Sequence, residues 1–82
     1  MKLYYYNGAC NCAGARIRIA REKLGLSQEQ LAARIQVKGL DINQKVISRV
    51  ETGVRVIPDY ELRFYAEALE VGILWLLGAK EV

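Results

Sequence analysis

The 82-residue chain has no histidine, a single proline and only two cysteines, Cys10 and Cys12. Without histidine, several enzyme mechanisms lose their usual general base. Two thiols fall short of the four ligands of a structural zinc site, so only a site shared between chains would allow a metal role. A disulfide this local is sterically strained. Because paired acids in an apolar setting and a glycine-rich phosphate loop are also missing, we expect no enzyme, no metal and no cofactor.

Long apolar stretches are missing too. The longest, near residues 71–79, is too short to span a bilayer, and no signal peptide is recognisable. We therefore expect a cytoplasmic protein without a membrane partner. The length suits one domain with one small core.

Charge is unevenly distributed along the chain. Residues 1–58 contain ten lysines and arginines against four acids, whereas residues 59–82 contain two against five. The basic part could face a polyanion while the acidic part faces away. Uneven surface charge without any function is the alternative.

Apolar spacing and capping residues predict an all-α fold. The first helix is expected at residues 13–23, ending at Gly25, and the second after Ser27, where Gln30 completes a capping box. The third follows a cap at Asp41 or Asn43 and ends at residues 52–53. The fourth is expected after Pro58, with Asp59 as its cap, and the last at residues 73–77.

These helices predict a compact five-helix bundle over residues 13–82. Residues facing its core should be Ile17, Ala20, Leu24, Leu31, Ala32, Ile35, Ile42, Val46, Ile47, Val50, Leu62, Tyr65, Ala66 and Leu69.

Residues 1–12 are expected to form an N-terminal arm, or a segment packed on the domain. A cluster of aromatics, Tyr4, Tyr5 and Tyr6, precedes an Asn7-Gly8 turn signal, but no alternating run follows, so no hairpin is expected. Stacking of the tyrosines on bases is one role open to this arm.

The third helix carries the most informative surface. Its apolar residues share one side, and the other side carries Gln44, Lys45, Ser48 and Arg49, with no acid among them. An ordinary solvated face favours Glu–Lys pairs four residues apart. Amide and cationic side chains can instead read base edges in the major groove of DNA, into which an α-helix fits. Two helices joined by a turn, the second with such a face, are typical of a helix-turn-helix.

With this helix pattern and this polar face on the third helix, the chain resembles the phage Cro and repressor (Xre-like) helix-turn-helix family, whose fold is lambda-repressor-like. The resemblance covers residues 14–78 through the stretches ARIRIAREKLGLSQEQLAARI, VISRVETG and EALEV…LWLLG.

The resemblance implies roles for individual residues. The base-reading positions would be Gln44, Lys45, Ser48 and Arg49, and the phosphate-contacting positions Gln28, Asn43, Thr52 and Arg55. Gln28 would also orient Gln44. Arg21 and Glu51 would form an ion pair that ties the first helix to the end of the third. A solvated surface side chain is the alternative for Gln44 and, more strongly, for Arg55.

Two departures from the family pattern stand out. Residues 37–41 look like an insertion typical of a longer-turn branch, which leaves the docking angle of the third helix open and makes Lys38 an extra phosphate contact. Leu74 stands where the family usually has an acid, so the last helix is apolar nearly all round. We expect Ile73, Leu74 and Leu77 to form an isologous homodimer interface.

The expected function is therefore a sequence-specific DNA-binding transcriptional regulator, acting as a repressor, which binds a two-fold operator on double-stranded DNA as a homodimer. The alternative is an antitoxin or other protein-interaction module, whose main partner is a toxin and for which DNA binding is secondary. The apolar last helix and the tyrosine arm favour that alternative.

Overall fold

The computed structural model describes residues 5–79; Tyr4 of the tyrosine cluster lies outside this range. Between these limits the chain forms five helices and one isolated β-bridge, which confirms the predicted all-α, five-helix architecture. The helices are α1 (Gly14–Lys23), α2 (Gln28–Val37), α3 (Gln44–Glu51), α4 (Asp59–Leu69) and α5 (Ile73–Leu77).

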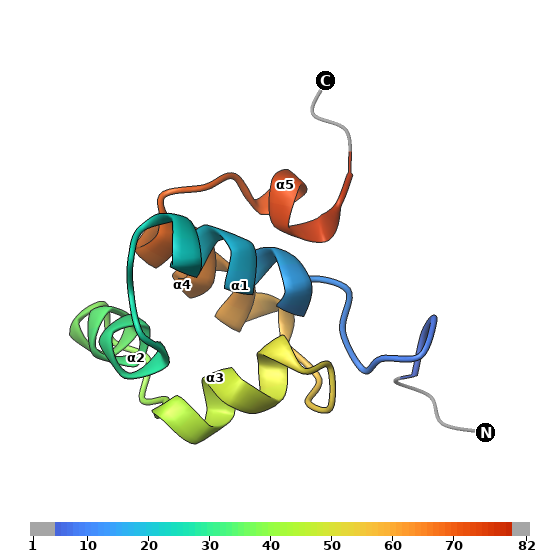
Figure 1. The fold of residues 1–82 in the computed structure, drawn as a ribbon, viewed down its shortest axis with the longest axis horizontal. Coiled ribbons are helices and arrows are strands. Elements are labelled where there is room, and N and C mark those ends of the chain that lie inside the picture. Colours follow the sequence, from blue (N-terminus) through green and yellow to red (C-terminus); the bar gives the residue numbers. More distant parts are fainter. Residues whose placement is uncertain (1–4, 80–82) are drawn as a thin grey trace.

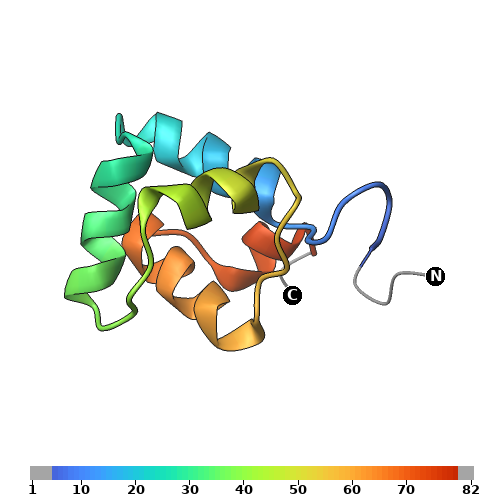
Figure 2. The same ribbon diagram turned by 90° about the horizontal axis from the view of Figure 1, so that it is seen from below.

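Helix α1 lies in the middle of the molecule and packs against α3, α4 and α5 (Figure 1). Helix α2 packs against α3 and α4, so α2 and α3 form the pair joined by a turn that the sequence predicts. In Figure 1, α3 and α5 lie on opposite sides of α1, and the view from below in Figure 2 looks onto α3. This arrangement leaves one long side of α3 open to solvent.

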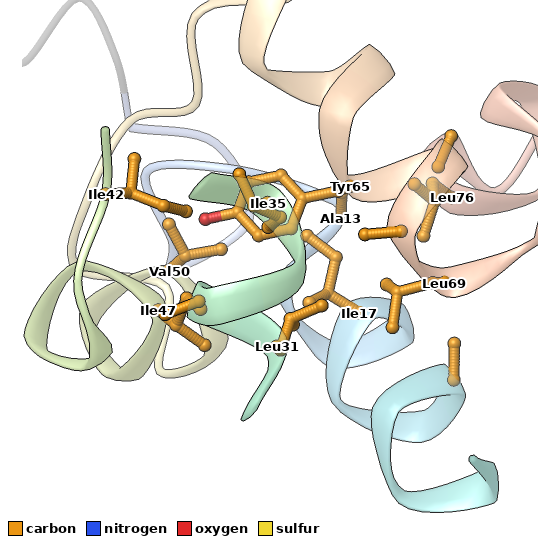
Figure 3. Close-up of a cluster of buried hydrophobic side chains, with 14 residues drawn as sticks. Ala13, Ile17, Leu31, Ile35, Ile42, Ile47, Val50, Tyr65, Leu69 and Leu76 are labelled. Carbon is orange, nitrogen blue, oxygen red and sulfur yellow. The ribbon is translucent and has the colours of Figure 1, made fainter. Parts of the chain in front are cut away.

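The core is built around the ring of Tyr65, which Figure 3 shows among aliphatic side chains from α1, α2, α3 and α4. Ile17, Ile35 and Ile47 are fully buried there. Of the predicted core residues, Val46 and Leu62 are only partly buried. Leu24 was predicted wrongly: it is exposed, because it is the C-cap residue of α1 and lies past the last turn that packs on the core.

Capping residues were predicted for the starts of α2, α3 and α4, and those of α2 and α3 are confirmed. Ser27 and Gln30 form both bonds of the capping box of α2, and the Asn43 side chain accepts from the Val46 N–H at the start of α3. Asp59 was wrongly predicted to cap α4: Pro58 is the N-cap and Asp59 is the first helical residue. The chain enters α4 with Pro58 at φ −59°, and Asp59 remains in the first turn, where its charge favours the helix dipole.

The N-terminal arm contains the expected turn. Tyr6 and Ala9 exchange two backbone hydrogen bonds of 2.7 and 3.1 Å around Asn7 and Gly8, both of which have positive φ. The pairing stops at this single bridge, so the described residues of the arm form no hairpin of strands. Among residues 5–79, every helix falls short of the length and apolarity that a membrane crossing requires.

Candidate nucleic-acid interface

Helix α3 presents a polar face to solvent because its other face is locked into the core. Ile47 and Val50 are fully buried, which fixes the rotation of this eight-residue helix. The side chains on the opposite side are Gln44, Lys45 and Arg49, which are exposed, and Ser48, which is partly buried.

The one acid of α3, Glu51, is turned away from this face. Its side chain is 3% exposed and receives Arg21 Nε at 2.6 Å and Arg21 Nη2 at 3.0 Å, a bidentate pair between α3 and α1. Arg21 also donates to the carbonyl oxygen of Leu26 at 2.7 Å. The hydrogen bond that Arg21 donates to Glu51 raises the pKa of Arg21, against the opposing effect of burial, so Arg21 stays charged. The outward face of α3 is therefore free of negative charge.

Gln28 connects this ion pair to the start of α3. Its amide nitrogen donates to Glu51 Oε1 at 3.0 Å, and its amide oxygen accepts from Gln44 Nε2 at 2.6 Å. The structure thus brings four of the residues singled out from the sequence into one hydrogen-bonded chain: Arg21, Glu51, Gln28 and Gln44. The first side chain of the α3 face is thus held by a hydrogen bond within the protein.

The connection between α2 and α3, residues 38–43, is held by contacts that the sequence did not indicate. Gly39 adopts φ +109°, a conformation that L side chains rarely adopt. The Gln36 amide donates to the carbonyl oxygen of Ile42 at 2.5 Å, and Ile42 itself is buried. Lys38, at the C-cap of α2, is exposed.

Beyond α3, the other expected phosphate contacts have intramolecular partners. The exposed Thr52 hydroxyl donates to the carbonyl oxygen of Ser48 at 3.0 Å. Arg55 forms a bidentate pair with Glu61 at 2.7 and 3.2 Å, and the carboxylate of Glu61 is 5% exposed. This hydrogen bonding raises the pKa of Arg55. Sequence analysis missed Glu61 because Arg55 lies in the loop before Pro58 and Glu61 lies in α4 after it, so no single periodic element relates the two side chains.

The expected dimer residues lie away from α3, on the other side of α1 (Figure 1). Ile73, Leu74 and Leu77 are 37–41% exposed, whereas Leu76 is buried and anchors α5 to the core. Trp75 is partly buried and lies beneath the Arg16 guanidinium, 5.1 Å from the ring centroid. An apolar strip is thus left on the outer side of α5.

The segment before α1 contributes a residue that sequence analysis missed. The Asn11 side chain accepts from the backbone N–H groups of Ala13 and Gly14, and so caps α1 from outside the helix. The signal was an asparagine two residues before the predicted start, a position typical of an Asx-turn. Cys10 and Cys12, on either side of Asn11, are free thiols.

The α3 face has the chemistry needed to recognise base pairs. Side-chain amides both donate and accept, and lysine and arginine donate to guanine acceptors in the major groove, which has the width of an α-helix. A model of a family described as helix-turn-helix matches residues 17–76, from within α1 to within α5. No curated protein matches the chain.

Proposed function

Because the chain belongs to the Cro and repressor-like helix-turn-helix family, it is a DNA-binding regulator, and we propose that it binds a two-fold operator as a homodimeric repressor. In this proposal α3 enters the major groove, and its side chains select the sequence. Contacts to the phosphate backbone supply most of the affinity and make it sensitive to salt.

The observation that carries the proposal is the combination of a polar, acid-free outer face on α3 with an inner face that is fully buried in the core. Gln44, Lys45 and Arg49 are exposed, while Glu51 is held inward by Arg21. A carboxylate on the outer face would be repelled by phosphates on either side of the groove. A helix that reads DNA therefore needs its acid turned away from this face, as Glu51 is. We assign base reading to Gln44, Lys45, Ser48 and Arg49.

The proposed phosphate contacts lie at the starts of α2 and α3 and in the segments that follow these helices. Gln28 and Asn43 stand at the starts of α2 and α3, where backbone N–H groups favour anions, and Thr52 follows the end of α3. Lys38 is an exposed cation on the connecting turn. Arg55 is assigned to this set despite its pair with Glu61, because a guanidinium has five N–H donors, of which the carboxylate receives two and the carbonyl oxygen of Val56 one.

The homodimer is proposed to form through the strip of Ile73, Leu74 and Leu77. A two-fold axis through this strip would place it against the same strip of a second copy. The apolar side chains of both copies would then be buried against each other and removed from water. Two copies would then present two α3 helices to half-sites about one helical turn, roughly 34 Å, apart.

Selection from random duplexes tests the proposal, because it reports sequence preference, symmetry and half-site spacing together. We expect an inverted repeat with half-sites about 10 base pairs apart. Arg49→Ala should lose the selected preference. Arg18→Ala is its control, since it removes the same charge from an exposed ion pair on α1. If the wild-type chain enriches no sequence at physiological salt, the proposal is wrong.

The exposed α5 strip also supports a second candidate, an antitoxin whose α5 binds a toxin. A depression of about 510 Å³ next to the strip, lined by Leu24, Leu69, Val71 and Trp75 among others, adds apolar surface. Light scattering on the purified chain separates the candidates. A dimer leaves the strip occupied by a second copy, whereas a monomer at micromolar concentration leaves it open and favours a different protein partner.

A further inference from the structure

Asn11 uses the full hydrogen-bonding capacity of its side-chain amide. Its oxygen accepts from the N–H groups of Ala13 at 3.1 Å and Gly14 at 2.7 Å. Its nitrogen donates to the carbonyl oxygens of Val50 at 3.0 Å and Arg55 at 2.9 Å. An asparagine amide offers two donors and one oxygen with two lone pairs, so all four positions are filled. One side chain therefore joins three segments: the start of α1, the last turn of α3 and the loop that leads to α4.

The backbone on either side of Asn11 also contacts the end of α3 and the loop that follows it. The Cys10 N–H donates to the carbonyl oxygen of Gly53 at 2.7 Å. A Cβ on Gly14 would lie only 2.1 Å from the carbonyl oxygen of Val50, so α1 approaches the end of α3 as closely as a glycine allows. Both ribbon views place this segment beside the end of α3 and the following loop (Figures 1 and 2).

We propose that Asn11 is a positioning residue for DNA recognition, which holds the C-terminal end of α3 at the angle needed in the groove. This inference rests on the proposed function. Ser48 and Arg49 directly precede Val50, so a tilt of the Val50 carbonyl displaces both. Gln28 holds the other end of α3 through Gln44. In this proposal, the residues that position α3 for DNA recognition thus include one that lies N-terminal to the family match at residues 17–76.

The substitution Asn11→Asp separates the capping of α1 from the hydrogen bonds that hold the end of α3. Aspartate has nearly the same shape and still accepts from Ala13 and Gly14, so the cap of α1 survives. The second oxygen, however, faces the carbonyl oxygens of Val50 and Arg55, which it repels. Asn7→Asp is the matched control, because it adds the same charge to the same arm at an exposed turn whose positive φ aspartate tolerates.

The experiment compares affinities of the full chain for its selected operator and for a random duplex. Circular dichroism first fixes a temperature at which every variant is folded. We expect Asn11→Asp to lower operator affinity about tenfold relative to Asn7→Asp, the size of effect that one mismatched base pair produces. Affinity for the random duplex should stay within about twofold of that control, since phosphate contacts dominate it. Asn11→Ala should lose the same discrimination and also melt at lower temperature.

Two other outcomes overturn the inference in different ways. If the wild type discriminates and both Asn11 variants keep its operator-to-random ratio while melting earlier, Asn11 is only a structural cap. If the wild type itself does not discriminate, the proposed function fails and the inference fails with it.

Discussion

Replacing Arg21 by alanine should damage the protein far more than the loss of an ordinary surface ion pair. The carboxylate of Glu51 is 3% exposed and the Arg21 side chain 12%, with contacts of 2.6 and 3.0 Å between them. Without Arg21, a buried negative charge would keep only the neutral amide of Gln28 as a partner. Solvent cannot replace the guanidinium at that depth.

The magnitude follows from this burial. Removing one partner of a buried ion pair typically costs about 3–5 kcal/mol, whereas an exposed pair contributes roughly 0–1 kcal/mol. A domain of this size has about 4–12 kcal/mol of stability in total. Arg21→Ala should therefore consume a large fraction of it and lower Tm by about 12 °C or more. Glu51→Ala should cost less, because the freed Arg21 still donates to the carbonyl oxygen of Leu26.

Urea unfolding of the two single variants and the double variant measures the coupling between these side chains. Fluorescence of Trp75, the only tryptophan, and circular dichroism provide two independent probes of two-state behaviour. We expect a coupling energy of about 1.5–3 kcal/mol, near the upper end for contacting residues. A coupling below about 0.5 kcal/mol would place the pair among surface ion pairs and refute the reasoning from burial.

Four further predictions concern single side chains. Gln44→Ala should cost about 1–3 kcal/mol on the selected operator and relax one base pair, measured by titrating operator variants; equal losses on every duplex would contradict base reading. Arg55→Ala should weaken all duplexes alike and reduce the slope of log K against log salt by about one, and an unchanged slope would remove it from the phosphate contacts. It should also lower stability, because it leaves the buried carboxylate of Glu61 unpaired. Tyr65→Phe should be neutral or stabilise by up to about 1–2 kcal/mol at pH 7, since the buried hydroxyl has no partner among the described residues. Burial raises the pKa of Tyr65 above its ordinary value of about 10, so above that pH the unfolded chain loses this proton before the folded protein does. Wild-type stability should therefore fall more steeply than that of Tyr65→Phe as pH rises past 10, and parallel curves from urea melts would contradict this. Leu74→Glu should convert a dimer into monomers by light scattering, and an unchanged mass would exclude α5 as the interface.

The fold was predictable where local chemistry decides it. The capping box at Ser27 and the bounds of α5 are short-range signals, and both match the structure. The two errors, Asp59 and Leu24, fall at helix ends. There, neighbouring residues compete for the cap position and for contact with the core, and the packing of the rest of the chain decides between them. Periodicity indicates which side of a helix is apolar, but it does not indicate how far along the helix the core extends.

The outward face of α3 was also predictable, because a helix buries its apolar side and exposes the other. Asn11 and Glu61 were not predictable as partners. Each acts on residues that local sequence patterns do not connect: the amide of Asn11 on the carbonyl oxygens of Val50 and Arg55, and the carboxylate of Glu61 on Arg55 across a proline. Such contacts depend on the final placement of α1 and α4 around α3.

The turn between α2 and α3, which the resemblance implies is longer than usual, raised the question of whether the two helices keep the relation that groove entry needs. The hydrogen bond of 2.6 Å between Gln44 and Gln28 still joins the start of α3 to the start of α2. Residues 38–43, which connect the two helices, lie outside that contact: the Gln36 amide donates to the carbonyl oxygen of Ile42, and the Ile42 side chain lies in the core. The connection therefore leaves the starts of the two helices in contact. The connection also carries Lys38, an exposed cation at the C-cap of α2, so we expect any effect of this connection on DNA to lie in phosphate contacts rather than in base reading.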